Sequence, residues 1–417
     1  MINNLKKNKK NINNFLLLAG KNIVLVVLSL FQLYILTQYL DIESYGKFQF
    51  VITILSSIAF FTLPGSNLAY NKMGAKNDER YYFSLLKYKI IFSYIGSFVL
   101  ISISLFNYDE KSLFYSLIVG SIAFPLYFNL DSYLSLLNGQ EKFYEKVKYE
   151  LLKQISIVGS LAIAVTFYNE DYFILLTILF SVSISFNLIA HFWLFKNSVE
   201  KKVTTRKVEN YKKYSKDMSW INVIGTIEAQ IDRVLVGVLF GFTSLAIYHV
   251  AKVIQDQLKN IWVVFVNMIM PRTYKKSKIK SIHFLLKIIT PVFVVFFVIV
   301  LMVIFILPTI FTFVFDEKYF DAMNYLNVML FGVLIGIPNA VLIIYFNTYS
   351  KLKDLLIIKI TTSVVYFLSL ILFVYYWEIW GIIFANIARI SYASLITIVY
   401  FIIERKKVLL ENKYASS

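Results

Sequence analysis

The chain has 417 residues, of which 58% are hydrophobic and 16% are charged, and its mean hydropathy is +0.66. Soluble domains carry about a quarter charged residues, so a water-soluble globule is excluded. The chain has no cysteine, which excludes disulfides and thiolate chemistry. Its net charge of +17 comes from Lys and Arg residues in short loops between apolar runs, where membrane topology explains them better than nucleic-acid binding.

The apolar runs predict an all-α integral membrane protein with twelve transmembrane helices. About twenty residues of helix cross the hydrocarbon core, and only helices satisfy their backbone groups within it. The first run follows a basic segment, as in a signal peptide, but Lys21 interrupts it and no small-residue cleavage site follows, so we interpret it as a retained helix. The predicted spans are 15–40, 47–71, 83–106, 112–137, 147–168, 172–195, 218–241, 244–271, 283–307, 321–346, 355–377 and 379–403.

The loops between these spans predict an orientation. One set of alternate loops and termini holds 32 Lys and Arg residues, and the other set holds 3. Since cytoplasmic loops hold the excess, both termini are expected in the cytoplasm. The longest cytoplasmic connection, 196–217, is basic and separates an N-terminal lobe, 1–195, from a C-terminal lobe, 218–403, which a cytoplasmic tail follows at 404–417.

An internal similarity supports two lobes of six helices. Residues 40–48, LDIESYGKF, resemble residues 240–248, FGFTSLAIY, and both segments follow the first span of their lobe. Because six is an even number, the two lobes have the same orientation. A pseudo-twofold axis along the membrane normal is therefore expected.

Besides the Lys and Arg residues counted with the loops, seven lie inside the predicted spans, where burying one charge costs at least about 2.5 kcal/mol. Lys21, Lys153 and Lys359 begin their spans at the inside edge, and snorkelling to the headgroups explains them. Arg389 in the last span is a candidate cavity residue or a partner in helix–helix hydrogen bonding.

Spans seven and eight carry polar stripes. Arg233 lies on the polar side of span seven with Glu228 and Asp232. Lys252, Asp256 and Lys259 stack on one face of span eight, and Lys252 and Asp256 form a favourable i,i+4 pair. Facing stripes on neighbouring helices predict one polar cavity; the alternative is that the charges only neutralise each other as interhelical ion pairs.

No phosphate-binding loop, HExxH or GxSxG motif is present, so the sequence predicts a transporter without a cofactor rather than an enzyme. The three histidines are scattered, and no metal site is expected. Energy would then come from H⁺ or Na⁺ coupling, from the membrane potential or from the substrate gradient.

Four segments resemble a known family. They are YLDIESYGKFQF at 39–50, LPGSNLAYNKMGAK at 63–76, IDRVLVGVLFGFTSLAIYHVAK at 231–252 and MIMPRTYKK at 268–276. These segments are similar to those of bacterial polysaccharide exporters, the Wzx-type flippases for O-antigen and capsule repeat units, which belong to the multidrug/oligosaccharidyl-lipid/polysaccharide (MOP) superfamily.

The resemblance implies a function in the bacterial inner membrane. Such proteins move an undecaprenyl-diphosphate-linked oligosaccharide between leaflets by alternating access, and cations facing their cavity attract the diphosphate. The resemblance places Asp232, Arg233 and Lys252 at cavity-facing positions, and Lys21, Asp256 and Lys259 are further candidates for the same cavity. Besides substrate and membrane lipids, a polysaccharide polymerase and a chain-length regulator are candidate partners, and nucleic acid is not.

Two other functions compete with this interpretation. A cation-coupled drug exporter of the same superfamily would share the fold but bind organic cations in an acidic site. A polysaccharide polymerase would need a sizeable outside loop, which the chain lacks.

Overall fold

The computed structural model describes residues 2–168, 171–196, 205–274, 277–349 and 352–415. Within these ranges the chain is helical and has no β-strand, so the predicted all-α class is confirmed. The chain forms two compact units, Met1–Ala246 and Ile247–Ser417.

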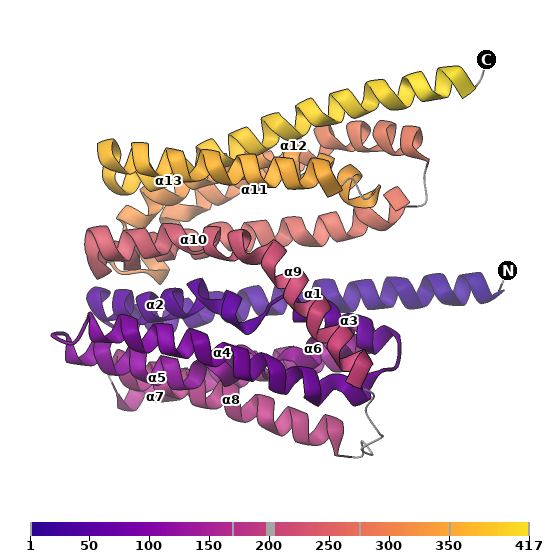
Figure 1. Ribbon diagram of the computed structural model, residues 1–417. Coiled ribbons are helices and arrows are strands. Elements are labelled where there is room, and N and C mark those ends of the chain that lie inside the picture. The colour runs from indigo at the N-terminus through magenta and orange to yellow at the C-terminus, as the bar shows by residue number, and fades with distance from the viewer. Residues whose placement is uncertain (1, 169–170, 197–204, 275–276, 350–351, 416–417) are drawn as a thin grey trace. The chain divides into compact units, whose positions relative to one another are not determined.

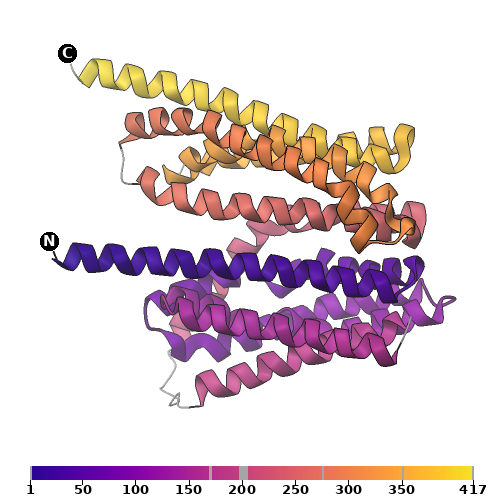
Figure 2. The same ribbon diagram turned by 180° about the vertical axis from the view of Figure 1, so that it is seen from behind.

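Helices of the first unit pack both against neighbours in the chain and against helices far from them in the sequence (Figure 1). The most extensive contacts join α4 to α5, α1 to α7 and α3 to α6, and Figure 2 shows α1 lying alongside α7. The elements are α1 (Ile2–Tyr39), α2 (Ile42–Ser57), η1 (Ala59–Thr62), α3 (Ser66–Ala75), η2 (Glu79–Tyr81), α4 (Tyr82–Leu105), α5 (Lys111–Tyr127), α6 (Ser132–Gly139), α7 (Phe143–Phe167), α8 (Tyr172–Phe195), α9 (Thr205–Glu228) and the start of α10 (Ile231–Tyr274).

The second unit is built from the remainder of α10 and four further elements. They are α11 (Lys278–Val314), η3 (Glu317–Tyr319), α12 (Asp321–Thr348) and α13 (Leu352–Ala415). Within this unit α12 makes the most extensive contacts, first with α13 and then with α11. It is therefore the central helix of the unit.

Apolar length confirms the membrane class. Nine helical segments in the described part of the chain are long and apolar enough to cross a membrane, or ten when the bent pair Ile42–Ser57 and Ala59–Ala75 counts as one. The segment Lys353–Glu411 holds both of the last two predicted spans, because α13 continues through their connection with only a break at Glu378, where φ is 50°. Each of the twelve predicted ranges thus falls on helix, although orientation and the pseudo-twofold relation stay predictions.

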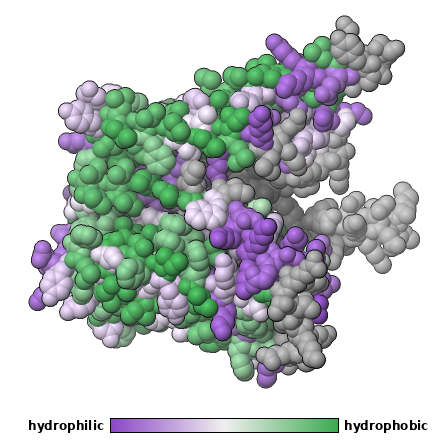
Figure 3. All heavy atoms as spheres, in the orientation of Figure 1, coloured by the Kyte–Doolittle hydropathy of each residue, from purple (hydrophilic) through white to green (hydrophobic). Residues whose placement is uncertain are grey.

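Three spans predicted as single helices are divided. Span 47–71 bends by 52° between α2 and α3, and span 112–137 is split between α5 and α6. The prediction of one helix over 218–241 is wrong: α9 ends at Glu228, and α10 begins at Ile231 after a turn at Ala229 and Gln230. Helix α9 is also too polar to be among the candidate spans, and Figure 3 shows hydrophilic side chains gathered over it.

Helix α9 belongs to the first unit by its contacts. It packs on α3 and α4, where the hydroxyl of Tyr211 donates to Asp78 Oδ2 at 2.9 Å and the backbone N–H of Gly65 donates to Ser219 Oγ at 3.0 Å. Its start is formed by residues 205–217 of the predicted linker, whereas residues 197–204 lie outside the described ranges. The division into lobes 1–195 and 218–403 stays a prediction, since the compact units meet inside α10.

The two similar segments both lie at turns between helices. In the first, Asp41 accepts hydrogen bonds from the backbone N–H groups of Glu43 and Ser44 and caps α2. In the second, Gly241 has a φ of +85°, which glycine tolerates best, and α10 bends there. The segments also touch, because Gly46 packs so closely on Phe242 that a Cβ would lie 2.0 Å from the Phe242 carbonyl oxygen.

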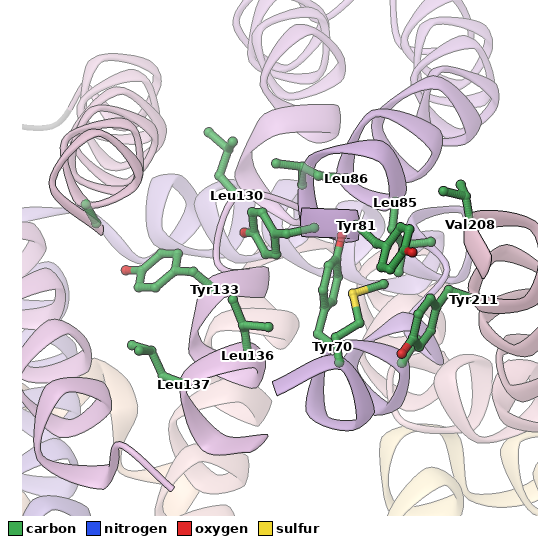
Figure 4. Close-up of a cluster of buried hydrophobic side chains, with 14 residues drawn as sticks. Tyr70, Tyr81, Leu85, Leu86, Leu130, Tyr133, Leu136, Leu137, Val208 and Tyr211 are labelled. Carbon is green, nitrogen blue, oxygen red and sulfur yellow. The ribbon is translucent and has the colours of Figure 1, made fainter. Parts of the chain in front are cut away.

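Tyrosines fill the core of the first unit (Figure 4). Tyr70, Tyr81 and Tyr133 are fully buried among leucines of α4 and α6, and Tyr211 joins them from α9. Buried tyrosine combines a large apolar ring with a hydroxyl that needs a partner. The core therefore fixes α3, α4, α6 and α9 to one another.

Candidate functional site

A pocket of about 250 Å³ in the second unit brings two predicted site residues together. Lys259 reaches it from α10 and Arg389 from α13, although 130 positions separate them in the sequence. The rest of the lining is mostly apolar, and the lining residues are Lys259, Phe296, Gly332, Val333, Gly336, Ile337, Asn339, Ala340, Arg389 and Ile390. The pocket thus combines two cations with an apolar wall.

Small residues on α12 make this pocket possible. Gly332 and Gly336 face α13, where a Cβ on Gly336 would lie 3.2 Å from Ile390 Cγ2. The spacing of this pair, G-x-x-x-G, is typical of helices that pack closely, as α12 and α13 do here. Sequence reasoning missed that the same glycines also line the cationic pocket, because the motif says nothing about which charges lie opposite.

Lys259 is held by its own helix. Its Nζ donates to Asp256 Oδ1 and to Gln255 Oε1, both at 3.1 Å. Asp256 pairs with Lys259 at i,i+3 in addition to the i,i+4 relation to Lys252 that the sequence suggested. Gln255 in turn donates to the carbonyl of Met329, which ties α10 to α12. The ammonium of Lys259 is therefore fixed at the pocket.

Arg389 is positioned by two neighbours. One guanidinium nitrogen, Nη2, donates to Asn386 Oδ1 at 3.0 Å, and the guanidinium carbon lies 4.9 Å from the centre of the Tyr366 ring. A cation over an aromatic face is stabilised by the ring quadrupole. This arrangement orients the planar fork of Arg389 at the wall of the pocket.

Lys252 adds a third positive charge to this region. It is only 5% exposed, and both Lys252 and Arg389 lie close enough to Lys259 for their charges to interact with it. Asp256 is the carboxylate within the described residues that forms an ion pair with Lys259. Among the lining residues that the structure describes there are two cations, Lys259 and Arg389, and no carboxylate, and this lining favours an anion.

The remaining predicted residues on span seven lie at the break between α9 and α10, in the first unit. Asp232 is 2% exposed, and its Oδ1 accepts the backbone N–H of Arg233 at 2.9 Å, in the first turn of α10. Arg233 donates from Nη1 to Gln230 Oε1 at 3.3 Å, and Glu228 is the last residue of α9. Asp232 and the turn thus shape the helix start, and the substrate contact predicted for Arg233 stays a prediction.

Lys21 lies in an interhelical ion pair. Its Nζ donates to Glu150 Oε2 at 2.7 Å and joins α1 to α7, with 12% and 19% of the two side chains exposed. Sequence reasoning proposed snorkelling or substrate binding for Lys21, and this pairing across 129 positions had no signal in local spacing. The ion pair adds a third interpretation to snorkelling and substrate binding, namely that Lys21 stabilises the contact between α1 and α7.

Metal-ligand geometry is not found in the described ranges: no group of three His, Asp or Glu side chains there could hold an ion.

Comparisons with known proteins bear on the family and on the fold of the chain. The family model described as polysaccharide biosynthesis protein matches residues 12–277. No curated protein matches the chain. Among solved structures, an inward-facing multidrug resistance MATE family transporter of the MOP superfamily is similar with a TM-score of 0.68 at 12% identity, covering 91% of this chain and 95% of that one.

Two further structures show the same fold. An outward-facing MATE family transporter of the MOP superfamily matches with a TM-score of 0.57 at 14% identity, covering 94% of this chain and 99% of that one. A mutant of a Vibrio cholerae MATE transporter matches with a TM-score of 0.53 at 12% identity, covering 96% and 97%. At these identities the likeness shows the fold alone, which is that of MOP-superfamily transporters.

Proposed function

The chain belongs to the polysaccharide biosynthesis protein family, and we propose that it is a flippase for an undecaprenyl-diphosphate-linked oligosaccharide. It would carry the repeat unit of an O-antigen or another surface polysaccharide from the cytoplasmic to the periplasmic leaflet by alternating access. The bacterial inner membrane is its proposed location, with both termini in the cytoplasm, as the loop charges indicate.

The single observation that carries this proposal is that Lys259 and Arg389 line the same pocket. A diphosphate is an anion rich in acceptor oxygens. Arginine holds such a group through a bidentate fork, and lysine supplies a point charge. The apolar remainder of the lining suits a ligand whose charged group is attached to an isoprenoid chain.

The main alternative is a cation-coupled drug exporter, because the similar solved structures include multidrug resistance transporters. Such a protein needs a binding site that attracts organic cations. Lys259 and Arg389 would repel them, and Lys252 adds to that repulsion. Charge therefore favours the anionic lipid carrier over a drug.

The test measures surface polysaccharide in cells that rely on variants of this protein. Arg389→Gln and Lys259→Gln remove one pocket cation each, and Lys287→Gln removes an exposed lysine of α11 as a matched control. Losing one charge-assisted contact costs about 1.5 to 3 kcal/mol, so affinity should fall about 10- to 100-fold.

We expect lower export in both pocket variants, with normal export in Lys287→Gln and equal amounts of protein in the membrane. Arg389→Lys should retain part of the activity, because it keeps the charge and loses only the fork. Normal export in both pocket variants would overturn the proposal.

A further inference from the structure

A second cavity, of about 240 Å³, lies wholly within the first unit and shares no lining residue with the pocket of Lys259 and Arg389. Its lining comes from α3, from α6 with the residue before it, and from α7. Seven of its eight lining residues are polar or charged: Asn67, Asn71, Asp131, Ser135, Asn138, Lys146 and Glu150, with Leu134 as the eighth. The cavity is thus lined almost entirely by groups that can form hydrogen bonds.

Part of the lining is fixed by a chain of hydrogen bonds. Lys146 Nζ donates to Asn138 Oδ1, and Asn138 Nδ2 donates to Asn71 Oδ1, both at 3.0 Å. Glu150 accepts from Lys21 at 2.7 Å and lies 4.0 Å from Lys146. These bonds hold the amides and the ammonium in set orientations before any ligand arrives.

Other groups on the lining remain available. Within the residues that the structure describes, neither the carboxylate of Asp131 nor the hydroxyl of Ser135 makes a side-chain hydrogen bond or an ion pair. Lys146 has further N–H donors beyond the one given to Asn138. The cavity therefore offers both acceptors and donors to a guest.

Charge and shape restrict that guest. Besides Lys146 and Lys21, the ammonium groups of Lys89 and Lys153 lie close enough to act on Asp131 from outside the lining, so the surroundings do not favour a cation. The two carboxylates on the lining itself, Asp131 and Glu150, disfavour an anion. The lining has no aromatic ring of the kind that holds organic cations. Its volume is below the roughly 300 to 1,000 Å³ of pockets for drug-sized ligands, which fits one small ring.

We propose that this cavity binds one uncharged sugar ring of the transported oligosaccharide. Sugar hydroxyls both donate and accept, so they can donate to the Asp131 carboxylate and accept from the amide and ammonium groups of the lining. The assignment rests on the proposed function, because it gives the flippase a means of recognising the saccharide separately from the diphosphate of the carrier.

The test uses the purified full chain in detergent and saturation-transfer NMR with three probes: methyl glucopyranoside, methyl N-acetylglucosaminide and tetramethylammonium. Ser135→Leu fills the cavity without removing a charge, and Asp131→Asn removes the available carboxylate. Asp109→Asn changes an exposed acid of the same unit and is the matched control. Thermal unfolding of each variant shows whether it has folded.

At least one glycoside should bind, with no binding to Ser135→Leu, about tenfold weaker binding to Asp131→Asn and unchanged binding to Asp109→Asn. The proposal is overturned if no glycoside binds, if both cavity variants bind as the native chain does, or if tetramethylammonium binds and Ser135→Leu abolishes it. Failure of the proposed function is read separately, as normal export by Arg389→Gln and Lys259→Gln.

Discussion

Exchanging the charges of Lys21 and Glu150 separates the structural role of this pair from the substrate contact predicted for Lys21. The two side chains meet at 2.7 Å between α1 and α7, and they are mostly but not fully buried. We expect Lys21→Ala and Glu150→Ala each to destabilise the protein, since each removes the 2.7 Å contact, and after Lys21→Ala the carboxylate of Glu150 keeps only the longer contact of 4.0 Å with Lys146.

The magnitude follows from the exposure of the pair. Exposed ion pairs contribute about 0 to 1 kcal/mol, and breaking a fully buried pair costs about 3 to 5 kcal/mol. With 12% and 19% of the side chains exposed, an intermediate cost of roughly 1 to 3 kcal/mol is expected for each single variant. The exposed pair Lys212 and Glu209, at 2.8 Å on α9, is the matched control and should contribute less than about 1 kcal/mol.

The assay is a double-mutant cycle on unfolding in detergent, with polysaccharide export measured on the same variants. A structural pair predicts that Lys21→Glu combined with Glu150→Lys recovers part of the stability that either single reversal loses, because the new lysine then lies beside Lys146. If the exchanged pair is stable but does not export, one of the two residues acts on the substrate, either Lys21 or Glu150 on the lining of the cavity of the first unit. If the single variants unfold as the native chain does, the argument from burial is refuted.

Three other predictions test the fold. Gly46→Ala should lower stability by about 1 to 3 kcal/mol because its Cβ would meet a backbone carbonyl at 2.0 Å, whereas Gly159→Ala, with nothing within 4 Å, should be neutral or stabilising; equal unfolding temperatures would contradict this. Burial, and then the hydrogen bond to Asp78, raise the pKa of the Tyr211 hydroxyl. The contribution of this hydroxyl to the free energy of unfolding should therefore be full below pH 10 and decline as the pH rises further. A difference in unfolding free energy between the native chain and Tyr211→Phe that stays constant with pH would be contrary evidence. A cysteine at Ser198, outside the described residues, should react with an impermeant label only after the membrane is opened, and labelling of intact cells would reverse the orientation.

Helix positions could be predicted because a segment that crosses hydrocarbon must satisfy its own backbone hydrogen bonds, which a helix does. Apolar length located the helices, and loop composition located the break at Glu378 between the last two spans. The break at Ala229 and Gln230 could not be predicted, since neither residue is Gly or Pro and the polar stripe runs through it. Packing of α9 on α3 and α4 overrides the local pattern there.

The candidate site was predictable only in its residue types. The free-energy cost of burying a charge in the membrane identified Lys259, Arg389 and Lys21 as candidates, but it does not predict which of these residues lie close together. Lys259 and Arg389 share a pocket because α12 allows close approach, and Lys21 instead meets Glu150. Such pairings depend on helix rotation and contact, which periodicity alone does not determine.

Transport by the purified protein in liposomes tests the central claim most directly. One set of liposomes contains a fluorescent undecaprenyl-diphosphate-linked saccharide, and a second set is loaded with the organic cation ethidium. We expect the protein to move the lipid-linked saccharide between leaflets, Arg389→Gln to slow that movement, and ethidium to stay where it was loaded. Ethidium transport without movement of the lipid-linked saccharide would contradict the account and identify a drug exporter.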